Sequence, residues 1–365
     1  MVSIVYQIST MIKSAWFFPD NITLADIPAN YPGLQQGSFE FLRFRKSKFG
    51  PEGASLADSH VYQMAHEWFG GLVYSAENAK FIKQNIPEPY VTVSGRHETG
   101  VAEMLADPAE MKCAVDAIVD FTKSIGFVGV DLNIEGVVRF TRSEASKYVA
   151  WLEMLANALR ARGLKFRFVT HSESLERPPH FTNESISHLI SKIDYILPMC
   201  YDAQYTLGKS EICPVGFAEK TIEQLLDQGW PAYKIIAGVA NYGYTAHRDN
   251  VWDVKIVYPR EARPLLPEPP VTRTQSEEIY NELPDGRYMY YRDGYSLTSQ
   301  VYDLVQGYGI AGFSMWAAQD DGDWFDEELY DEFDMDDEME ECAMCRFRTA
   351  GHEFIDAMVD VLRWV

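Results

Sequence analysis

The stretch Phe127-Val128-Gly129-Val130-Asp131-Leu132-Asn133-Ile134-Glu135 decides the fold of this 365-residue chain. In a strand, alternate side chains lie on opposite faces, so four apolar residues share one face while Gly129, Asp131, Asn133 and Glu135 share the other. A solvated edge strand would show the same alternation. This stretch, however, follows a long amphipathic helix, which is typical of a βαβ unit whose sheet is covered on both faces. We therefore expect the polar row to point into a barrel or a crevice, where a carboxylate must be paired, hydrogen-bonded or used.

The helix before this stretch has clear boundaries, and the same alternation of helix and strand runs along the chain. Asp107 is expected at its N-cap, Pro108 at its first position, and Gly126 at its end. Strands are predicted over residues 2–8, 39–45, 90–94, 127–135, 165–170, 195–201, 235–239 and 310–316, with residues 9–50 otherwise irregular. Helical patterns are predicted within 58–86 and over 107–125, 143–162, 186–193, 221–227 and 296–305, the last capped by Ser296.

Eight strands separated mostly by helices predict an α/β fold of the TIM (β/α)8 barrel type. A doubly wound open sheet is the alternative. Such sheets usually carry a glycine-rich phosphate loop after the first strand, and this chain has none there. The barrel is therefore the favoured fold.

The domain boundaries follow from where the alternation stops. A barrel domain is expected over residues 1–318, with 247–290 as an insertion or elaborated loop. An acidic loop is expected over 319–348, because residues 320–341 contain 14 Asp and Glu residues and such runs are usually solvated. No glycine-centred loop of EF-hand spacing occurs there, which disfavours a calcium site. Residues 349–365 are expected to form a C-terminal helix that packs on the barrel.

Composition excludes several classes of partner. The formal net charge of -22 argues against nucleic acid, because phosphate binding needs a basic face. No run of 18 apolar residues predicts a membrane span. The N-terminus lacks a basic n-region, so we expect an intracellular protein or one whose leader was removed. The five cysteines are an odd number, and Cys342-Ala343-Met344-Cys345 has no second pair nearby, so neither a disulfide framework, a metal nor a cofactor is predicted.

Reactive and aromatic side chains are concentrated at the carboxyl ends of the predicted strands, where TIM barrels build their active sites. Glu135 ends the fourth strand and Trp316 ends the eighth. Tyr201 and Asp202 follow the sixth, and residues 241–244 follow the seventh. Each of these alone would more often be a core or rim residue. Their occurrence at the same ends of several strands favours a common site.

From about Tyr90 to Trp316 the chain resembles glycoside hydrolase family 18, the chitinases and their relatives. The family signature D-G-x-D-x-D-x-E aligns with residues 128–135, and its M-x-Y-D motif aligns with 199–202. Residues 230–243 and 312–321 resemble the segments around its seventh and eighth strands. The first 60 residues match the family poorly.

The resemblance implies substrate-assisted, retaining hydrolysis of β-1,4-linked N-acetylglucosamine, in chitin, in chito-oligosaccharides or in the core of N-glycans. It implies that Glu135 is the general acid. The remaining residues implied to be catalytic are Asp131, Asn133, Tyr201 and Asp202. In the family pattern Asp131 shares charge or a proton with position 133. The residues implied to bind substrate are Trp316, as a stacking floor for the sugar, and Tyr242, Met199, Ser94 and Tyr6. Neither a metal nor a membrane is implied.

Three departures from the family pattern matter. Val128 replaces the first Asp of the signature, and Ser94-Gly95-Arg96-His97 stands where the family often has S-x-G-G. Asn133 replaces the middle Asp, and an amide can neither carry negative charge nor pass on a proton. Loss of one preorganised electrostatic partner typically costs on the order of 10²–10³ in rate. In addition, the segment 247–290 is short. An α+β insertion after the seventh strand is therefore expected to be small or absent, and the substrate groove to be shallow.

Three functions therefore remain open. The first is a family 18 hydrolase in which Asn133 impairs turnover. The second is a chitinase-like lectin that binds N-acetylglucosamine oligomers with little or no catalysis. The third is an interaction or storage protein on a barrel scaffold, supported only by the acidic segment 320–341, because fold alone does not fix function.

Overall fold

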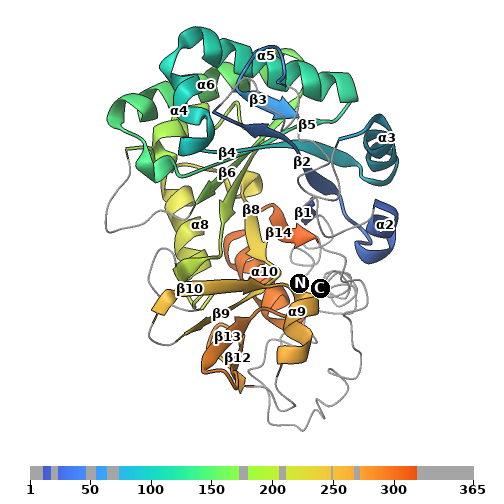
Figure 1. The fold of residues 1–365 in the computed structure, drawn as a ribbon, viewed down its shortest axis with the longest axis vertical. Helices are drawn as coiled ribbons and strands as arrows, with labels where there is room; N and C mark the ends of the chain where they lie inside the picture. Colours follow the sequence, from blue (N-terminus) through green and yellow to red (C-terminus); the bar gives the residue numbers. More distant parts are fainter. Residues whose placement is uncertain are drawn as a thin grey trace.

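The computed structural model describes residues 11–17, 24–46, 55–63, 74–171, 180–204, 211–247, 250–266 and 272–318. Parallel strands form a barrel in the order β1-β14-β8-β7-β6-β5-β4-β2, closed by the pairing of β1 with β2 (Figure 1). The barrel strands are β1 (Ile12–Phe17), β2 (Gln36–Phe44), β4 (Glu88–Arg96), β5 (Gly129–Glu135), β6 (Lys165–His171), β7 (Tyr195–Met199), β8 (Ile236–Ala240) and β14 (Gly312–Ala318). A short strand, β3 (Val61–Gln63), pairs antiparallel with β2 outside the barrel. The TIM barrel prediction is confirmed, and the open sheet is excluded.

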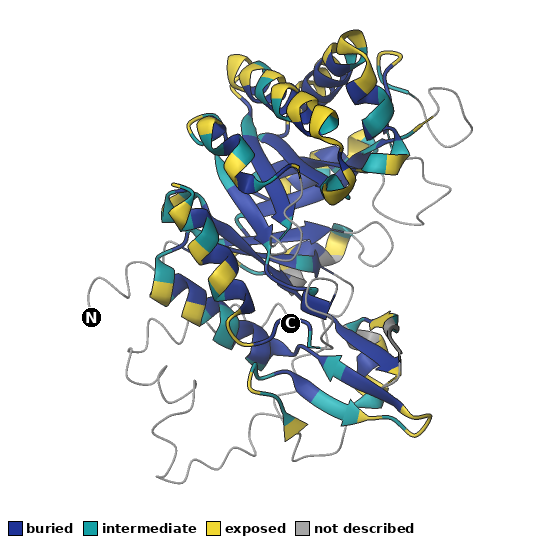
Figure 2. Ribbon diagram, turned by 90° about the vertical axis from the view of Figure 1, so that its left-hand side faces the viewer, coloured by how far each residue is buried: buried dark blue, intermediate teal, exposed yellow. Residues whose placement is uncertain are grey.

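Helices surround the barrel and turn polar faces outward. Figure 2 shows this division, with dark blue strands inside helices whose outer faces are yellow. The helices are α2 (Ile27–Asn30), α3 (Ala76–Asn85), α4 (Val101–Ala106), α5 (Pro108–Ile125), α6 (Arg142–Ala161), α8 (Phe217–Asp227) and α10 (Gly294–Tyr308). The predicted boundaries of α5 are confirmed, because the Asp107 side chain accepts from the Ala109 amide and Gly126 ends the helix at φ 73°. Among the described residues, no helix is long and apolar enough to cross a membrane.

The first barrel strand was predicted in the wrong place. It is β1, residues 12–17, within a segment expected to be irregular, and its pairing with β14 and β2 closes the barrel. Residues 1–10, including the candidate Tyr6, lie outside the described residues. Two smaller corrections concern helices: α10 is capped by Asp293 instead of Ser296, and the helix expected over 186–193 is a 3-10 helix at Asn183–Leu189.

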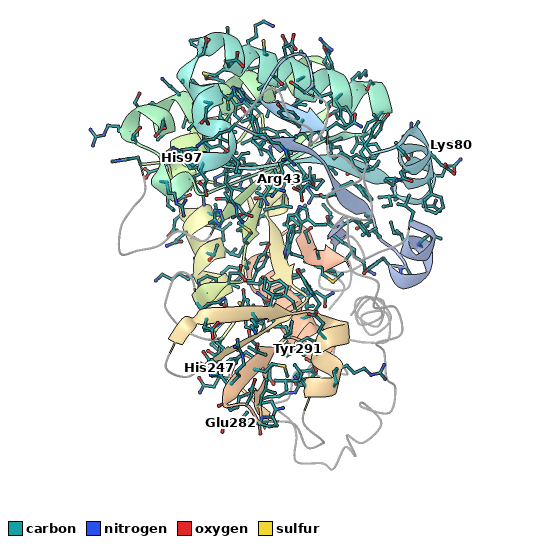
Figure 3. The ribbon with its side chains drawn as sticks, in the orientation of Figure 1. Arg43, Lys80, His97, His247, Glu282 and Tyr291 are labelled. Carbon is teal, nitrogen blue, oxygen red and sulfur yellow. The ribbon has the colours of Figure 1, made fainter. Side chains whose placement is uncertain are left out.

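An antiparallel sheet is inserted between β8 and α10, at the bottom of Figure 1. Its strand order is β10-β9-β13-β12-β11. The elements are β9 (Gly243–His247), β10 (Asn250–Val257), β11 (Thr272–Arg273), β12 (Ile279–Glu282), β13 (Arg287–Tyr291) and the one-turn helix α9 (Pro259–Ala262). Figure 3 labels His247, Glu282 and Tyr291 in this sheet, away from Arg43 on the barrel. The insertion expected to be small or absent is thus present, as a small five-stranded sheet.

The expectations for the last part of the chain lie outside the described residues. These are the acidic loop over 319–348 and the helix over 349–365. The candidate site can therefore be built only from the barrel and its insertion.

Candidate active site

The polar row of β5 points into the barrel, as its alternation predicts. Val130, Leu132 and Ile134 are buried in the large apolar cluster that joins the strands to the helices. On the other face, Asp131 and Asn133 are also buried. The row therefore rises from the closed interior to the carboxyl end of the strand, where Glu135 retains 34% side-chain exposure.

Asp131 is the deepest of these three polar residues, and side chains from β1, β2 and β6 hold it. Trp16 Nε1 donates to its Oδ2 at 2.6 Å, and Ser38 Oγ donates to the same oxygen at 2.5 Å. Arg167 NH2 lies 3.7 Å from that oxygen. Burial raises the pKa of Asp131, whereas Arg167 and the two hydrogen bonds lower it.

Arg167 completes a network across the barrel below the mouth. Its NH1 donates to Ser14 Oγ and to Gln36 Oε1, each at 3.0 Å, and its guanidinium lies 4.7 Å from the centre of the Tyr90 ring. The resemblance implied that Asp131 shares charge or a proton with position 133. The hydrogen-bond and ion-pair partners found for Asp131 lie instead on β1, β2 and β6, and the side chain of Asn133 makes no hydrogen bond among the described residues.

Glu135, at the end of the row, forms an ion pair with Arg96. The two residues lie opposite each other in the β4–β5 register. Arg96 NH2 lies 3.1 Å from Glu135 Oε2, and Arg96 Nε donates to the same oxygen at 3.2 Å. His171, which ends β6, faces the same region: burial lowers its pKa, and the charge of Glu135 raises it.

A cluster of tyrosines surrounds Asp202 after β7. Tyr242 donates to Asp202 Oδ1 at 2.5 Å, and Tyr244, on the first strand of the insertion, donates to the same oxygen. Burial raises the pKa of Asp202, the two tyrosine hydrogen bonds lower it, and the nearby charge of Glu135 raises it. Asp202 has a φ of 62°, in the left-handed region that Asp tolerates better than most residues. Tyr201 packs edge-on against Tyr242, with ring centres 6.2 Å apart.

Two tryptophans and a methionine form the apolar part of the mouth. Trp316, on β14, meets Trp16 edge-on, with ring centres 5.7 Å apart and planes inclined by 66°. Met199, the last residue of β7, belongs to the same apolar cluster. The peptide bond after Trp316 is cis. An aromatic face therefore stands near the carboxylates, a combination suited to binding a sugar.

Sequence reasoning missed Glu40, on β2. Ser94, from the neighbouring strand β4, donates its hydroxyl to Glu40 Oε1. The signal was present, because Gln36, Ser38 and Glu40 alternate with glycine and phenylalanine as the row of β5 alternates with aliphatic residues. The predicted strand began at residue 39, three residues late, which hid this polar row. Trp16 was missed because β1 was not predicted.

The structure thus brings most of the predicted site residues to one end of the barrel. They are Ser94, Asn133, Glu135, Met199, Tyr201, Asp202, Tyr242 and Trp316, with Asp131 beneath them. Tyr6 lies outside the described residues. No group of three or more His, Cys, Asp or Glu side chains that could hold a metal ion occurs in the described part of the chain.

Comparison with known proteins agrees with this arrangement. Residues 55–321 match the family model of Glycosyl hydrolases family 18. A class V chitinase from Nicotiana tobaccum superposes with a TM-score of 0.67 at 15% identity, covering 86% of this chain and 96% of the other. A mutant of that chitinase has been solved in complex with NAG4.

Bacterial structures give similar values. A chitinase from Chromobacterium violaceum superposes with a TM-score of 0.65 at 17% identity, covering 84% of this chain and 94% of the other. The spore cortex-lytic enzyme SleL of Bacillus cereus superposes with a TM-score of 0.64 at 15% identity, covering 84% of this chain and 70% of the other. No curated protein sequence matches significantly. At these identities the structural neighbours establish the shared fold, and the family assignment rests on the sequence match.

Proposed function

The chain belongs to glycosyl hydrolase family 18, and we propose that it hydrolyses β-1,4-linked N-acetylglucosamine by the substrate-assisted, retaining route. The observation that carries this proposal is the position of Glu135. It is a partly exposed carboxylate at the carboxyl end of a barrel strand, facing buried Tyr201 and Asp202 across the mouth. The complex of the tobacco chitinase with NAG4 supports a chito-oligosaccharide as the ligand.

In this mechanism Glu135 donates its proton to the glycosidic oxygen as the bond from that oxygen to the anomeric carbon breaks. The carbonyl oxygen of the substrate's own N-acetyl group attacks the anomeric carbon, which forms an oxazolinium ion. Glu135 then takes a proton from the water that opens this ion, so the acid is regenerated and configuration is retained. No carboxylate of the protein becomes covalently attached to the sugar.

The other site residues receive roles that fit their surroundings. Asn133 presents an amide to the N-acetyl group, and the hydroxyl of Tyr201 donates to its carbonyl oxygen. Asp202, fixed by Tyr242 and Tyr244, helps to place the sugar. Trp316 forms the apolar floor under the ring, because sugar C–H groups are attracted to an aromatic face.

Turnover of a fluorogenic chito-oligosaccharide tests the proposal. A positioned general acid contributes about 10²–10⁴ in rate, so Glu135→Gln is expected to lower kcat by that factor. Glu153→Gln is the matched control, because Glu153 pairs with Lys192 at 2.7 Å on the outside of α6. Equal background rates for wild type, Glu135→Gln and Glu153→Gln would remove the hydrolase assignment.

Asn133 favours a second candidate, a lectin that binds the same oligomers without efficient turnover. Its amide is 8% exposed at the site, where the family signature has an acid. Calorimetry with the N-acetylglucosamine tetramer separates the two candidates. Binding without turnover in wild type, with turnover gained in Asn133→Asp, would establish the lectin. Undetectable binding would exclude it.

A further inference from the structure

A buried carboxylate that is hydrogen-bonded to Ser94 has no role in the proposed mechanism. Glu40, on β2, is 9% exposed, and its Oε1 accepts the hydroxyl hydrogen of Ser94. Arg43 Nε lies 3.9 Å from the same oxygen, in a pairing three residues apart on the strand. An irregularity in the β2–β4 register between Glu40 and Leu42 accompanies this placement.

Glu40 is linked to the catalytic row through Ser94. Ser94 lies directly opposite Asn133 in the parallel register of β4 and β5. The three residues therefore lie on three adjacent strands, with Glu40 hydrogen-bonded to Ser94 and Ser94 opposite Asn133. The pKa of Glu40 is raised by burial and by the charge of Glu135, and lowered by Ser94 and Arg43.

We propose that Glu40 is a further carboxylate of the site, a positioning residue that acts through Ser94 and supplies near the row of β5 the negative charge that Asn133 cannot carry. This inference rests on the proposed function. The oxazolinium ion is positive, and a preorganised negative charge beside it lowers the barrier because it needs no reorganisation during the reaction. The same positive charge favours the ionised form of Glu40 in the transition state.

The arrangement also explains why a buried carboxylate is present on β2. A buried carboxylate costs free energy unless hydrogen bonds or a cation compensate it. Glu40 has one hydrogen bond from Ser94 and a cation at 3.9 Å, whereas Glu88, at the opposite end of the barrel, is bonded by both Gln36 and Lys165. Glu88 is thus the better compensated of the two carboxylates.

A cycle of variants tests the proposal with kcat and KM measured separately on a fluorogenic chito-oligosaccharide. Glu40→Gln keeps the shape and the hydrogen bond to Ser94 and removes the charge. We expect kcat to fall by at least about tenfold with KM within about threefold, a smaller loss than that of a direct partner. Asn133→Asp restores a charge at position 133. In that background Glu40→Gln is expected to lower kcat by less than about threefold. Glu88→Gln, the matched control, is expected to leave both constants unchanged.

Ser94→Ala is the second variant, and it keeps the test valid if Glu40→Gln folds poorly in a thermal melt. It removes the hydrogen bond from Ser94 to Glu40 and is expected to lower kcat, with the same rescue by Asn133→Asp. The proposal is wrong if Glu40→Gln keeps the wild-type kcat. It is also wrong if Glu40→Gln lowers kcat equally with Asp and with Asn at position 133. Either result would leave the hydrolase assignment intact. Equal background rates in wild type and Glu135→Gln would overturn both.

Discussion

At the scale of single residues, the ion pair between Glu135 and Arg96 decides how readily the proposed acid can act. The ion pair occupies an oxygen of Glu135, whereas a general acid must direct its carboxyl group at the glycosidic oxygen. Arg96 engages Oε2 through two nitrogens, at 3.1 and 3.2 Å. Catalysis therefore requires Glu135 to leave Arg96 or to be displaced from it by the substrate.

Arg96→Gln is predicted to raise kcat at neutral pH by a few-fold, because the acid no longer has to break the ion pair. Both side chains are partly exposed, 58% for Arg96 and 34% for Glu135, so stability should change by less than about 1 kcal/mol. Steady-state kinetics and a thermal melt measure the two effects. Arg139→Gln, which removes the exposed pair with Glu98 nearby, is the control and should change neither. A lower kcat in Arg96→Gln would instead make Arg96 a residue that orients Glu135.

At this scale the sequence predicted one half of the site well. The row Asp131, Asn133 and Glu135 follows from strict alternation within a single strand, which needs no knowledge of neighbouring strands. The partners of the row could not be predicted in this way. Glu40 and Arg167 reach it from β2 and β6, and sequence alone does not give the relative register of strands that are far apart in the chain.

At the scale of elements, a buried ion pair attaches the inserted sheet to the barrel. Glu278, directly before β12, is fully buried and accepts from the backbone amides of Ile212 and Cys213 at 3.0 and 2.7 Å. Arg292, directly after β13, donates to Glu278 at 3.1 Å. Ile212 is in turn bonded to the residue after Asp202, because its carbonyl accepts from the amide of Ala203. The insertion thereby supports one side of the site.

Arg292→Met is predicted to destabilise the protein by about 3–5 kcal/mol, because it leaves Glu278 buried and charged without its cation. Adding Glu278→Gln should recover part of this loss, since the amide oxygen still accepts a backbone hydrogen bond. Urea unfolding of the two single variants and the double variant measures the coupling. Arg162→Met is the control: its pair with Asp120 at 2.8 Å is exposed and should contribute less than about 1 kcal/mol. If Arg292→Met lowers the free energy of unfolding as little as Arg162→Met does, the pair of Glu278 and Arg292 does not hold the sheet to the barrel.

The elements show why prediction succeeded in some places and failed in others. β5 and α5 have strong local signals, in alternation and in a capping sequence, and both are found as predicted. β1 is six residues long and mixes Lys13 and Ser14 with aromatic residues, and its stability comes from pairing with β14 and β2. The inserted sheet likewise consists of short antiparallel strands whose pairing, not their composition, defines them. Elements stabilised mainly by distant partners leave little local signal.

At the scale of the whole molecule, charge sets the pH dependence of stability. Burial raises the pKa of five carboxyl groups, those of Glu40, Asp131, Asp202, Glu277 and Glu278. Their stabilising contribution is complete below the unfolded-state pKa of about 4, and it is lost as the pH rises through the folded-state value. Hydrogen bonds from Thr141 lower the pKa of Glu144, whose contribution is instead present above about pH 4 and lost as the pH falls.

These opposite dependences, with a net charge of -22, predict maximal stability at mildly acidic pH. The melting temperature should be higher at about pH 5 than at pH 8, because ionisation of the buried carboxyl groups and mutual repulsion both increase toward alkaline pH. Adding 1 M salt at pH 8 screens exposed charges, so it should reverse the part of the decrease in melting temperature that is due to repulsion. The part that is due to the buried carboxyl groups should remain. Asp202→Asn removes one buried group, so its melting temperature should fall less between pH 5 and pH 8 than that of wild type. If wild type is as stable at pH 8 as at pH 5, its buried carboxylates are fully compensated in their charged forms, and the predicted loss of stability at alkaline pH is wrong.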